Sequence, residues 1–313
     1  MDLKSRICKD LQIPETLFDS SVSNARRAVY QFKIPKKNGD ERTIYQAAAK
    51  TKTIQYWLLK NIFEKVKSHP SSMAFSQGCS ILKNAECHRN NRFFLKIDLL
   101  NFFPSVTFED VKGALIKNWE QIDSLPPDKD LFELIRTVCF FKGDILPIGY
   151  PTSPILSNIA MLNFDEMVMS TLESSFGGDV TYTRYADDMV FSTNVPGRTH
   201  EVFKLIRQLI TTNTSPKISI NPDKTTSGSS SGGSAIVTGI KICPNHLTIT
   251  KKQKDEIRLL LSLYSKGRLR SSDYERTIGL ISFARNVDPS FFTRVSERFF
   301  REIRAIKKEL SDT

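Results

Sequence analysis

Several features that assign chains to other protein classes are scarce or missing in this chain of 313 residues. Its five cysteines are an odd number at irregular spacing, which argues against a disulfide framework and for a reducing compartment. Cys79, Cys87 and His88 are close in sequence, but no second Cys/His pair has zinc-finger spacing, so a structural zinc is not expected. The chain also has no internal repeats.

Long apolar runs are absent as well. No segment approaches the roughly 18 consecutive apolar residues of a membrane span. The N-terminal residues 1–6 are followed by no apolar stretch of a secretory signal. The sequence therefore predicts a soluble, cytoplasmic protein without a membrane partner.

Positive charge is in excess, and it is unevenly placed. The net charge is +11. Residues 24–67 carry 11 Lys/Arg against 3 Asp/Glu, and residues 248–313 carry 15 against 9, so the remaining residues sum to −3. Two basic lobes that flank a near-neutral middle favour a groove for a polyanion, although charge alone is also compatible with a generally basic soluble protein.

Periodicity and turn signals predict an α+β chain. An Asn-Gly turn marks a hairpin over 29–45, and the Ser/Gly-rich segment 227–234 is interpreted as a hairpin loop. The middle of the chain reads strand, helix, helix, hairpin, helix, strand, which suits a small antiparallel sheet with helices on one face. The other predicted elements are helices around 1–28 and at 47–67, 107–118, 131–141, 154–173 and 199–213, strands at 93–98, 216–220, 235–243 and 246–250, and a helical tail over 251–313.

Two acidic sites stand at the ends of apolar strands. Asp187 and Asp188 lie at the tip of the apolar hairpin 180–192, and Asp98 ends the apolar strand 93–98. Carboxylate oxygens are the ligands that Mg²⁺ prefers, and two-metal phosphoryl transfer needs two ions about 3.5–4 Å apart. The alternative reading of the doublet alone is a solvated turn, which the second acidic site disfavours.

Five segments in order resemble the reverse transcriptases, and two of them narrow the resemblance to retron enzymes. A lone Tyr-x-Asp-Asp would be weak, because tetrapeptides recur by chance, but five motifs in order over roughly residues 25–300 are specific. The segments are Phe94-Leu95-Lys96-Ile97-Asp98 with its continuation to Ser105, the PQGxxxSP-like Pro147–Pro154, Tyr185-Ala186-Asp187-Asp188, the NAxxH-like Asn84–His88 and the VTG-like Val237-Thr238-Gly239.

The resemblance implies a right-hand polymerase with fingers, a ferredoxin-like palm and a helical thumb. The implied boundaries are an N-terminal segment and fingers over 1–92, a palm over 93–245 with a fingers insertion around 119–150, and a basic helical thumb over 246–313.

The resemblance also implies a role for each of the three aspartates. We assign Asp98 and Asp187 as ligands of two Mg²⁺ ions, with Asp188 beside them as a tuning or intermittent ligand and the carbonyl of Leu99 completing one shell. One ion would activate the primer hydroxyl, and the other would hold the triphosphate of the dNTP substrate.

Four further residues are assigned to nucleotide binding. Phe103 corresponds to the steric gate that rejects a 2′-hydroxyl, provided that the chain bends after Asp98; a core Phe is the alternative, and Phe102 is interpreted as one. Gly149 permits a close backbone approach, where a template or nucleotide could pack, and Ile148 stands where the family has Gln.

The other two residues assigned to nucleotide binding are cationic. Arg42, with Lys36 and Lys37 across the hairpin, resembles the element that clamps the triphosphate, since a guanidinium binds phosphate oxygens in two places. A solvated charge run is a rival reading for the lysines. Lys224 is a candidate general acid toward pyrophosphate by position alone, and a surface turn lysine is an equal alternative.

RNA contacts are expected from two regions. Asn84 and His88 share a helix face if their segment is helical; the residues alone favour a cap and a histidine with satisfied hydrogen bonds, while the resemblance suggests that they help to hold the cognate RNA. In the basic tail the aromatics are expected in the core and the arginines toward RNA. The arginines assigned to RNA are Arg268, Arg270, Arg294 and Arg298.

The resemblance implies RNA-templated DNA synthesis. The template would be the retron's own structured RNA, primed from an internal guanosine 2′-hydroxyl to give branched multicopy DNA that stays bound. Antiphage defence is implied, with a separate effector protein and a host RNase H in trans, because no fused effector or nuclease motif is recognised. Two alternatives stay open: another bacterial reverse transcriptase, of an intron or diversity element, and an RNA–DNA scaffold that silences an effector.

Overall fold

The computed structural model describes residues 2–35, 39–122, 125–244 and 246–312. The chain divides into two compact units, each assembled from three segments. Unit 1 comprises Met1–Cys79, Lys96–Phe191 and His200–Thr226; unit 2 comprises Ser80–Leu95, Ser192–Thr199 and Ser227–Thr313. The predicted boundaries after residues 92 and 245 name polymerase subdomains rather than such units, and they remain a prediction.

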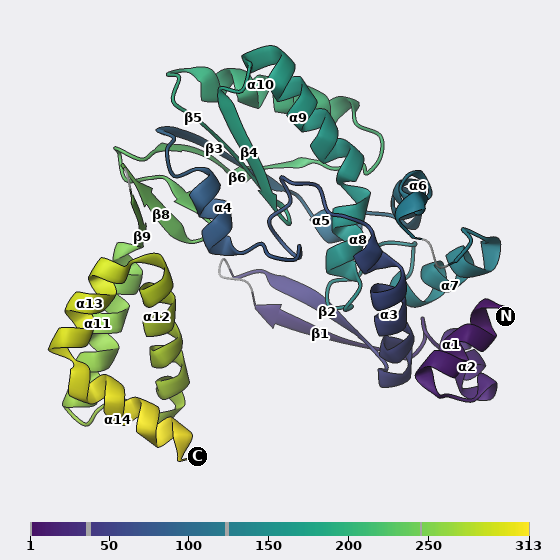
Figure 1. Ribbon diagram of the computed structural model, residues 1–313, viewed down its shortest axis with the longest axis horizontal. Coiled ribbons are helices and arrows are strands. Elements are labelled where there is room, and N and C mark those ends of the chain that lie inside the picture. The colour runs from purple at the N-terminus through teal and green to yellow at the C-terminus, as the bar shows by residue number, and fades with distance from the viewer. Residues whose placement is uncertain (1, 36–38, 123–124, 245, 313) are drawn as a thin grey trace. The chain divides into compact units, whose positions relative to one another are not determined.

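The main sheet has the βαββαβ order of a ferredoxin-like palm. Its four strands lie in the order β4-β5-β3-β6, so the first strand in sequence, β3, is internal, and the last, β6, flanks it (Figure 1). Helix α9 (Leu162–Phe176) runs beside β4, and α10 (Arg198–Thr212) links β5 to β6 (Figure 1). The predicted α+β palm is confirmed. The strands are β3 (Phe93–Leu99), β4 (Val180–Tyr185), β5 (Asp188–Thr193) and β6 (Ile220–Ser229).

Outside the main sheet, unit 1 holds a two-stranded hairpin and helices. Strands β1 (Val29–Pro35) and β2 (Glu41–Ala47) pair antiparallel, as the Asn-Gly signal predicted, and Gly39 has φ +89°. Three helices begin directly after a residue whose side-chain oxygen accepts a hydrogen bond from the first turn. These N-cap residues are Asp2, Thr107 and Asp128. The helices are α1 (Leu3–Leu11), α2 (Glu15–Ser23), α3 (Ala49–Asn61), α5 (Phe102–Ser105), α6 (Phe108–Lys117), α7 (Lys129–Cys139) and α8 (Ser153–Ala160), with 3₁₀ turns at Phe63–Lys65 and Trp119–Gln121.

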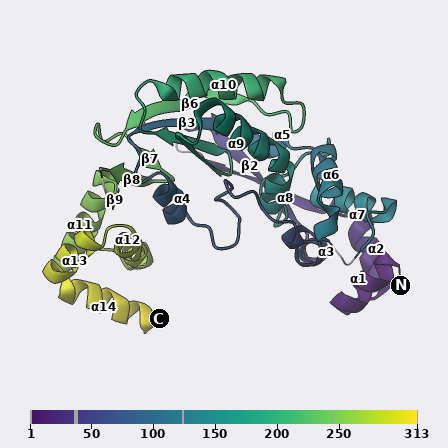
Figure 2. The ribbon, with the colours of Figure 1, turned by 45° about the horizontal axis from the view of Figure 1, so that its top comes forward.

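Unit 2 combines a short sheet with a helical bundle. Strands β7 (Ile236–Val237), β8 (Ile240–Cys243) and β9 (His246–Ile249) form an antiparallel sheet, with α4 (Ile81–Cys87) packed on β7 and β8, and α12 on β9 (Figure 2). The tail is helical, as predicted, and its buried faces meet in one bundle (Figure 1). The bundle helices are α11 (Lys251–Ser265), α12 (Tyr274–Val287), α13 (Pro289–Arg298) and α14 (Phe300–Ser311), with a 3₁₀ turn at Ser271–Asp273.

Four predicted elements were wrong in extent. The helix expected over 154–173 is two helices, because at Met161 the N–H is shared between the carbonyls of Ser157 and Asn158. The strand expected over 235–243 is two, because Thr238 and Gly239 have φ +45° and +82° and form a turn. The helix expected over 47–67 ends its α-helical part at Asn61, and the strand expected at 216–220 starts at Ile220 instead and runs into the Ser/Gly-rich segment.

Within the described ranges of the chain, every helix is too short or too polar to cross a bilayer.

Candidate active site

The acidic doublet lies at the β4–β5 reversal, as predicted. Ala186 has φ +57°, the left-handed region that a turn of this kind requires of one residue, and its small side chain is 8% exposed. Asp187 follows in the turn and Asp188 opens β5, and both are half-buried. The turn therefore presents two consecutive carboxyl groups that are only partly solvated.

Asp98 is brought to the same end of the sheet. It lies next to last in β3, and the N–H of Leu99 donates to the Asp187 carbonyl at 2.9 Å, which ties the end of β3 to the acidic turn. The two carboxylate oxygens of Asp98 have separate partners on β6. Asn221 Nδ2 donates to Oδ1 at 2.9 Å, and Lys224 Nζ donates to Oδ2 at 3.0 Å.

The electrostatics of this end of the sheet favour a cation. Burial raises the pKa of Asp187, and the neighbouring carboxylates of Asp188 and Asp98 raise it further, while Lys224 opposes them. The pKa of Asp188 is raised by burial and by Asp98, against the lowering effect of Lys96 and Lys224. Three carboxyl groups thus hold more negative charge than the two lysines offset.

The residues fit a hard divalent ion in donor chemistry. Carboxylates are its preferred ligands, and the Lys224 ammonium group already stands as a cation on one oxygen of Asp98. Among the described residues, no group of three or more His, Cys, Asp or Glu side chains meets the geometry to hold a metal by itself. Any ion here would therefore rely on further ligands, such as a substrate phosphate.

The bend that the steric-gate prediction required is present. Asn101 has φ +49°, and the short helix α5 starts directly after it. Phe102 is 3% exposed and belongs to the core, as predicted, whereas Phe103 is only partly buried. The two rings meet edge to face with centroids 5.6 Å apart. The Phe103 ring thus packs against Phe102 on one side and remains partly accessible to solvent.

Gly149 lies in close contact with the backbone of strand β2, so the close approach expected at this position is to the protein itself. A Cβ built at Gly149, whose φ is +112°, would lie 2.6 Å from the carbonyl oxygen of Tyr45 and 2.8 Å from Ile44 Cγ2, both on β2. The carbonyl of Ile148 accepts from the N–H of Tyr45 at 2.8 Å. This contact uses main-chain atoms alone, so it does not depend on the Gln that the family has at position 148.

The two cationic candidates are both exposed. Arg42 lies on β2 opposite Ile34, with its side chain in solvent. Lys224 has a side chain 60% exposed, although its amine reaches Asp98. Lys36 and Lys37 lie outside the described residues.

In unit 2 the NAxxH-like segment is helical, and its two assigned side chains are buried. Asn84 and His88 are both 0% exposed. His88 Nδ1 lies 2.6 Å from Ser192 Oγ, which also accepts from Asn91 Nδ2 at 2.7 Å, and burial lowers the pKa of His88 to about 4. His88 thus has a hydrogen-bond partner, as the residues alone favoured, and it is also fully buried, so a role with RNA would act through the shape of α4.

The VTG-like segment lies against the same helix. Thr238 Oγ1 donates to the carbonyl of Ile81, the first residue of α4, at 3.0 Å, although the two residues are 157 positions apart. Strand β7, which contains Val237, also contacts α4. The two segments that narrow the family resemblance thus form one structural feature.

The four arginines assigned to RNA are exposed on the bundle. Arg268 and Arg270 lie in the connection after α11, and Arg294 and Arg298 are four residues apart on α13. Of the aromatics interleaved with them, Phe299 is buried at 9% exposure, whereas Phe283 and Phe292 are partly buried and Phe300 is 63% exposed. The expected division between core aromatics and surface arginines therefore holds only in part.

Two residues of the site escaped the sequence analysis. Asn221 holds Asp98, and Arg184 supports the acidic turn from inside the protein. Arg184 carries a signal, because an arginine within an apolar strand needs an internal acid. That acid, Asp165, lies 19 residues earlier, in a helix whose pattern does not mark it.

Comparisons with known proteins show which family the chain belongs to. A family model described as reverse transcriptase (RNA-dependent DNA polymerase) matches residues 34–260. Retron Ec73 reverse transcriptase of Escherichia coli is 39% identical over 294 residues, 93% of this chain and 93% of that protein. Retron Ec83 reverse transcriptase of the same species is 33% identical over 88% of this chain and 89% of that protein. Retron Ec86 reverse transcriptase of Escherichia coli is 33% identical over 85% and 79%.

Proposed function

Because this chain belongs to the reverse transcriptase family and to its retron branch, we propose that it copies its own structured RNA into branched multicopy DNA. The chain is an RNA-directed DNA polymerase, a nucleotidyltransferase that uses dNTPs and divalent metal ions. In the proposal the ions are two Mg²⁺, the template is the cognate retron RNA, and synthesis starts from the 2′-hydroxyl of an internal guanosine.

One observation carries the chemical part of the proposal: three carboxyl groups, Asp98, Asp187 and Asp188, meet at one end of the palm sheet with Lys224 on Asp98. These three and the Leu99 carbonyl would hold the ions. When bound, the ions lower the pKa of the attacking hydroxyl and neutralise charge on the phosphates. Asn221 keeps the Asp98 carboxylate oriented through its hydrogen bond to Oδ1.

Other side chains bind and select the nucleotide. Arg42 offers an exposed guanidinium to the triphosphate. Phe103 lies under the sugar and excludes a 2′-hydroxyl, with the Phe102 ring behind it. Lys224, once released from Asp98, gives a proton to the departing pyrophosphate. Gly149 acts indirectly, by letting the 147–149 segment lie against β2.

The RNA would be held by unit 2. The exposed arginines on the bundle contact phosphates, and α4, shaped by buried Asn84 and His88, offers a fixed surface to structured RNA. The assigned arginines are Arg268, Arg270, Arg294 and Arg298. We place the protein in the cytoplasm, in antiphage defence, with an effector protein and a host RNase H supplied separately.

The test is to express the chain with the genomic locus of its RNA, extract the bound nucleic acid, and treat it with RNase and debranching enzyme. A short DNA whose mobility changes on debranching, and which is missing with Asp187→Asn, would support the proposal. The matched control is Asp130→Asn, which removes an exposed charge in the first turn of α7 and should leave the product intact.

Two results would contradict it. A DNA product that does not respond to debranching would indicate another priming chemistry, such as that of an intron or diversity-element enzyme. RNA without DNA under active conditions, with effector silencing that survives Asp187→Asn, would favour the scaffold function instead.

A further inference from the structure

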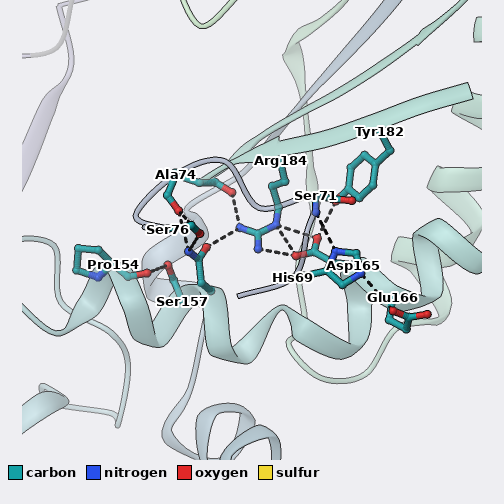
Figure 3. Close-up of polar contacts among 12 residues, drawn as sticks. His69, Ser71, Ala74, Ser76, Pro154, Ser157, Asp165, Glu166, Tyr182 and Arg184 are labelled. Carbon is teal, nitrogen blue, oxygen red and sulfur yellow. Dashed lines mark hydrogen bonds and ion pairs between the residues drawn. The ribbon is translucent and has the colours of Figure 1, made fainter. Parts of the chain in front are cut away.

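A fully buried ion pair lies directly behind the acidic turn. Arg184, on β4, and Asp165, on α9, are both 0% exposed. Arg184 Nε donates to both carboxylate oxygens of Asp165, at 2.9 and 3.1 Å, and Nη2 donates to Oδ2 at 2.6 Å (Figure 3). Tyr182 Oη donates to Asp165 Oδ1 at 2.7 Å (Figure 3). The carboxylate is thereby fully engaged by groups from β4.

The remaining nitrogen of the guanidinium points at the turn. Nη1 donates to the carbonyl of Ala186 at 3.1 Å and to Asn158 Oδ1 at 3.3 Å. Ala186 is the residue with φ +57°, and it directly precedes Asp187. A non-glycine residue in this region persists only where its surroundings hold it. The guanidinium therefore fixes the peptide that sets the direction of the next two carboxyl groups.

The main chain of Arg184 is held as well. Its N–H donates to the carbonyl of Ser71 at 2.7 Å, and its carbonyl accepts from the N–H of Met73 at 2.8 Å. Asn158 Nδ2 donates to the carbonyl of Ala74 at 2.8 Å. The arginine thus cannot shift along its strand without breaking contacts to the 71–74 segment and to α8.

The same guanidinium also lies behind the gate residue. Its Cζ is 5.9 Å from the centroid of the Phe102 ring, and Phe102 meets Phe103 edge to face. A cation over an aromatic face stabilises the position of that ring. One side chain therefore contacts both the peptide before the acids and the ring behind the proposed steric gate.

Stability alone does not require such a pair. Replacing a buried ion pair by well-packed apolar residues is often neutral or stabilising, so its presence calls for another reason. Here each of the three guanidinium nitrogens donates a hydrogen bond, and one of the bonds from Nη1 ends on the carbonyl of Ala186 in the acidic turn.

We propose that Arg184 is a positioning residue of the polymerase site: anchored by Asp165, it sets the Ala186 peptide, and with it Asp187 and Asp188, and it supports Phe102 behind Phe103. The proposal rests on the proposed assignment of Asp187 and Asp188 as the ligands of the polymerase reaction. Tyr182 shares the anchor, and its hydroxyl donates to Asp165 rather than to the turn, so it serves as the matched control.

The experiment compares Arg184→Lys with Tyr182→Phe in the full-length protein, using a DNA primer on an RNA template. Lysine keeps a cation for Asp165 but has one nitrogen, which cannot also hold the Ala186 carbonyl. We expect similar melting temperatures and primer–template affinities for the two variants. We expect kcat of Arg184→Lys to fall about 10²-fold, the loss that a misplacement on the order of 1 Å brings, and that of Tyr182→Phe to change little.

Two further readouts separate positioning from simple structural support. Mn²⁺ binding, measured by electron paramagnetic resonance on a chain-terminated complex, should weaken about 10-fold or more in Arg184→Lys, as it does when residues that orient metal ligands are removed. Misincorporation of ribonucleotides should rise in Arg184→Lys and stay unchanged in Tyr182→Phe.

Asn158→Ala is the second variant, in case Arg184→Lys does not fold. It leaves the ion pair intact and removes one of the two acceptors of Nη1, so kcat should fall by less than in Arg184→Lys without loss of primer–template binding. Equal kcat and equal Mn²⁺ affinity in Arg184→Lys, Asn158→Ala and Tyr182→Phe would overturn the positioning role. Full activity of Asp187→Asn would instead overturn the site assignment itself, whatever Arg184 does.

Discussion

Two aspartates of the palm are paired with basic side chains in opposite surroundings. Asp165 and Arg184 are both 0% exposed, and their pair is closed on all sides by hydrogen bonds. Asp98 has a 9% exposed side chain, but its partner Lys224 is 60% exposed and can leave. The closed pair suits a fixed support, whereas the open pair suits a carboxylate whose cation is exchanged during the reaction.

The largest expected effect is on the closed pair. Arg184→Ala leaves Asp165 charged, buried and without its partner, so the free energy of unfolding should fall by about 3–5 kcal/mol. Urea unfolding of the purified protein, followed by circular dichroism, measures this. Tyr182→Phe, which removes one hydrogen bond from the same cluster, should cost about 1 kcal/mol. If Arg184→Ala lowered the free energy of unfolding by less than Tyr182→Phe does, the Arg184–Asp165 pair would not be shielded from solvent as described.

His88 is another fully buried titratable group, and its response to pH sharpens the comparison. Burial lowers the pKa of His88 from 6.5 to about 4, so the folded protein resists its protonation. Its neutral form is fully compatible with folding above pH 6.5, and stability is lost as the pH falls toward 4. The loss is about 3 kcal/mol at 1.36 kcal/mol per pKa unit. His88→Gln should flatten this part of the pH–stability curve, and an unchanged slope would contradict the assignment.

Phe102 and Phe103 are adjacent in sequence but differ in burial, so their replacement should have different effects. Phe103→Ala should admit ribonucleotides, raising their use relative to dNTPs about 10-fold or more, because a lost steric clash is worth on the order of 1–3 kcal/mol. Phe102→Ala instead opens a cavity in the core and should destabilise the protein by about 3–5 kcal/mol. Steady-state incorporation of single nucleotides tests the first, and unchanged rejection of ribonucleotides by Phe103→Ala would refute the gate.

The acidic turn should itself gain stability when a charge is removed. The pKa of Asp188 is raised above its ordinary value of 3.8, so its charged form is disfavoured in the folded state. This penalty is absent at low pH and is complete above the raised pKa. In metal-free protein, Asp188→Asn should therefore raise the melting temperature by a few degrees at pH 7, and the gain should vanish below about pH 4. If the higher melting temperature of Asp188→Asn persisted at low pH, the stabilisation would come from packing rather than from the removed charge.

The smallest effect on stability is expected at the open pair. Lys224→Ala removes an exposed partner, so the free energy of unfolding should change by about 1 kcal/mol or less, measured as for Arg184→Ala. Its effect on the rate should be larger than on stability, because Lys224 is the proposed proton donor. A destabilisation equal to that of Arg184→Ala would remove the distinction between the two pairs.

Local patterns predicted the parts of the site that depend on neighbours in sequence. The bend after Asp98 was expected from the family resemblance, which places Phe103 at the nucleotide, and Asn101 provides it with φ +49°. The acidic turn, in contrast, follows from the apolar hairpin around Asp187. The Asn-Gly signal located the β1–β2 hairpin for the same reason. Each of these features is decided within a few residues, where turn and strand preferences act directly.

Long-range pairings were beyond such patterns. Nothing near Gly149 shows that the close neighbour is β2, about 100 residues earlier, rather than a nucleotide. The partner of His88, Ser192, is 104 residues away. The break at Met161 lies within a continuous apolar pattern, so periodicity alone extends the helix through it. In each case tertiary contacts decide what local propensity leaves open.

Gly149 also offers a practical handle on the enzyme. Since its missing side chain is what lets β2 approach, alanine at this position would wedge the β1–β2 hairpin outward without altering an acid of the turn. Such a change is a natural starting point for a temperature-sensitive allele, which would allow DNA synthesis to be stopped in growing cells by a modest rise in temperature while the protein is still being made.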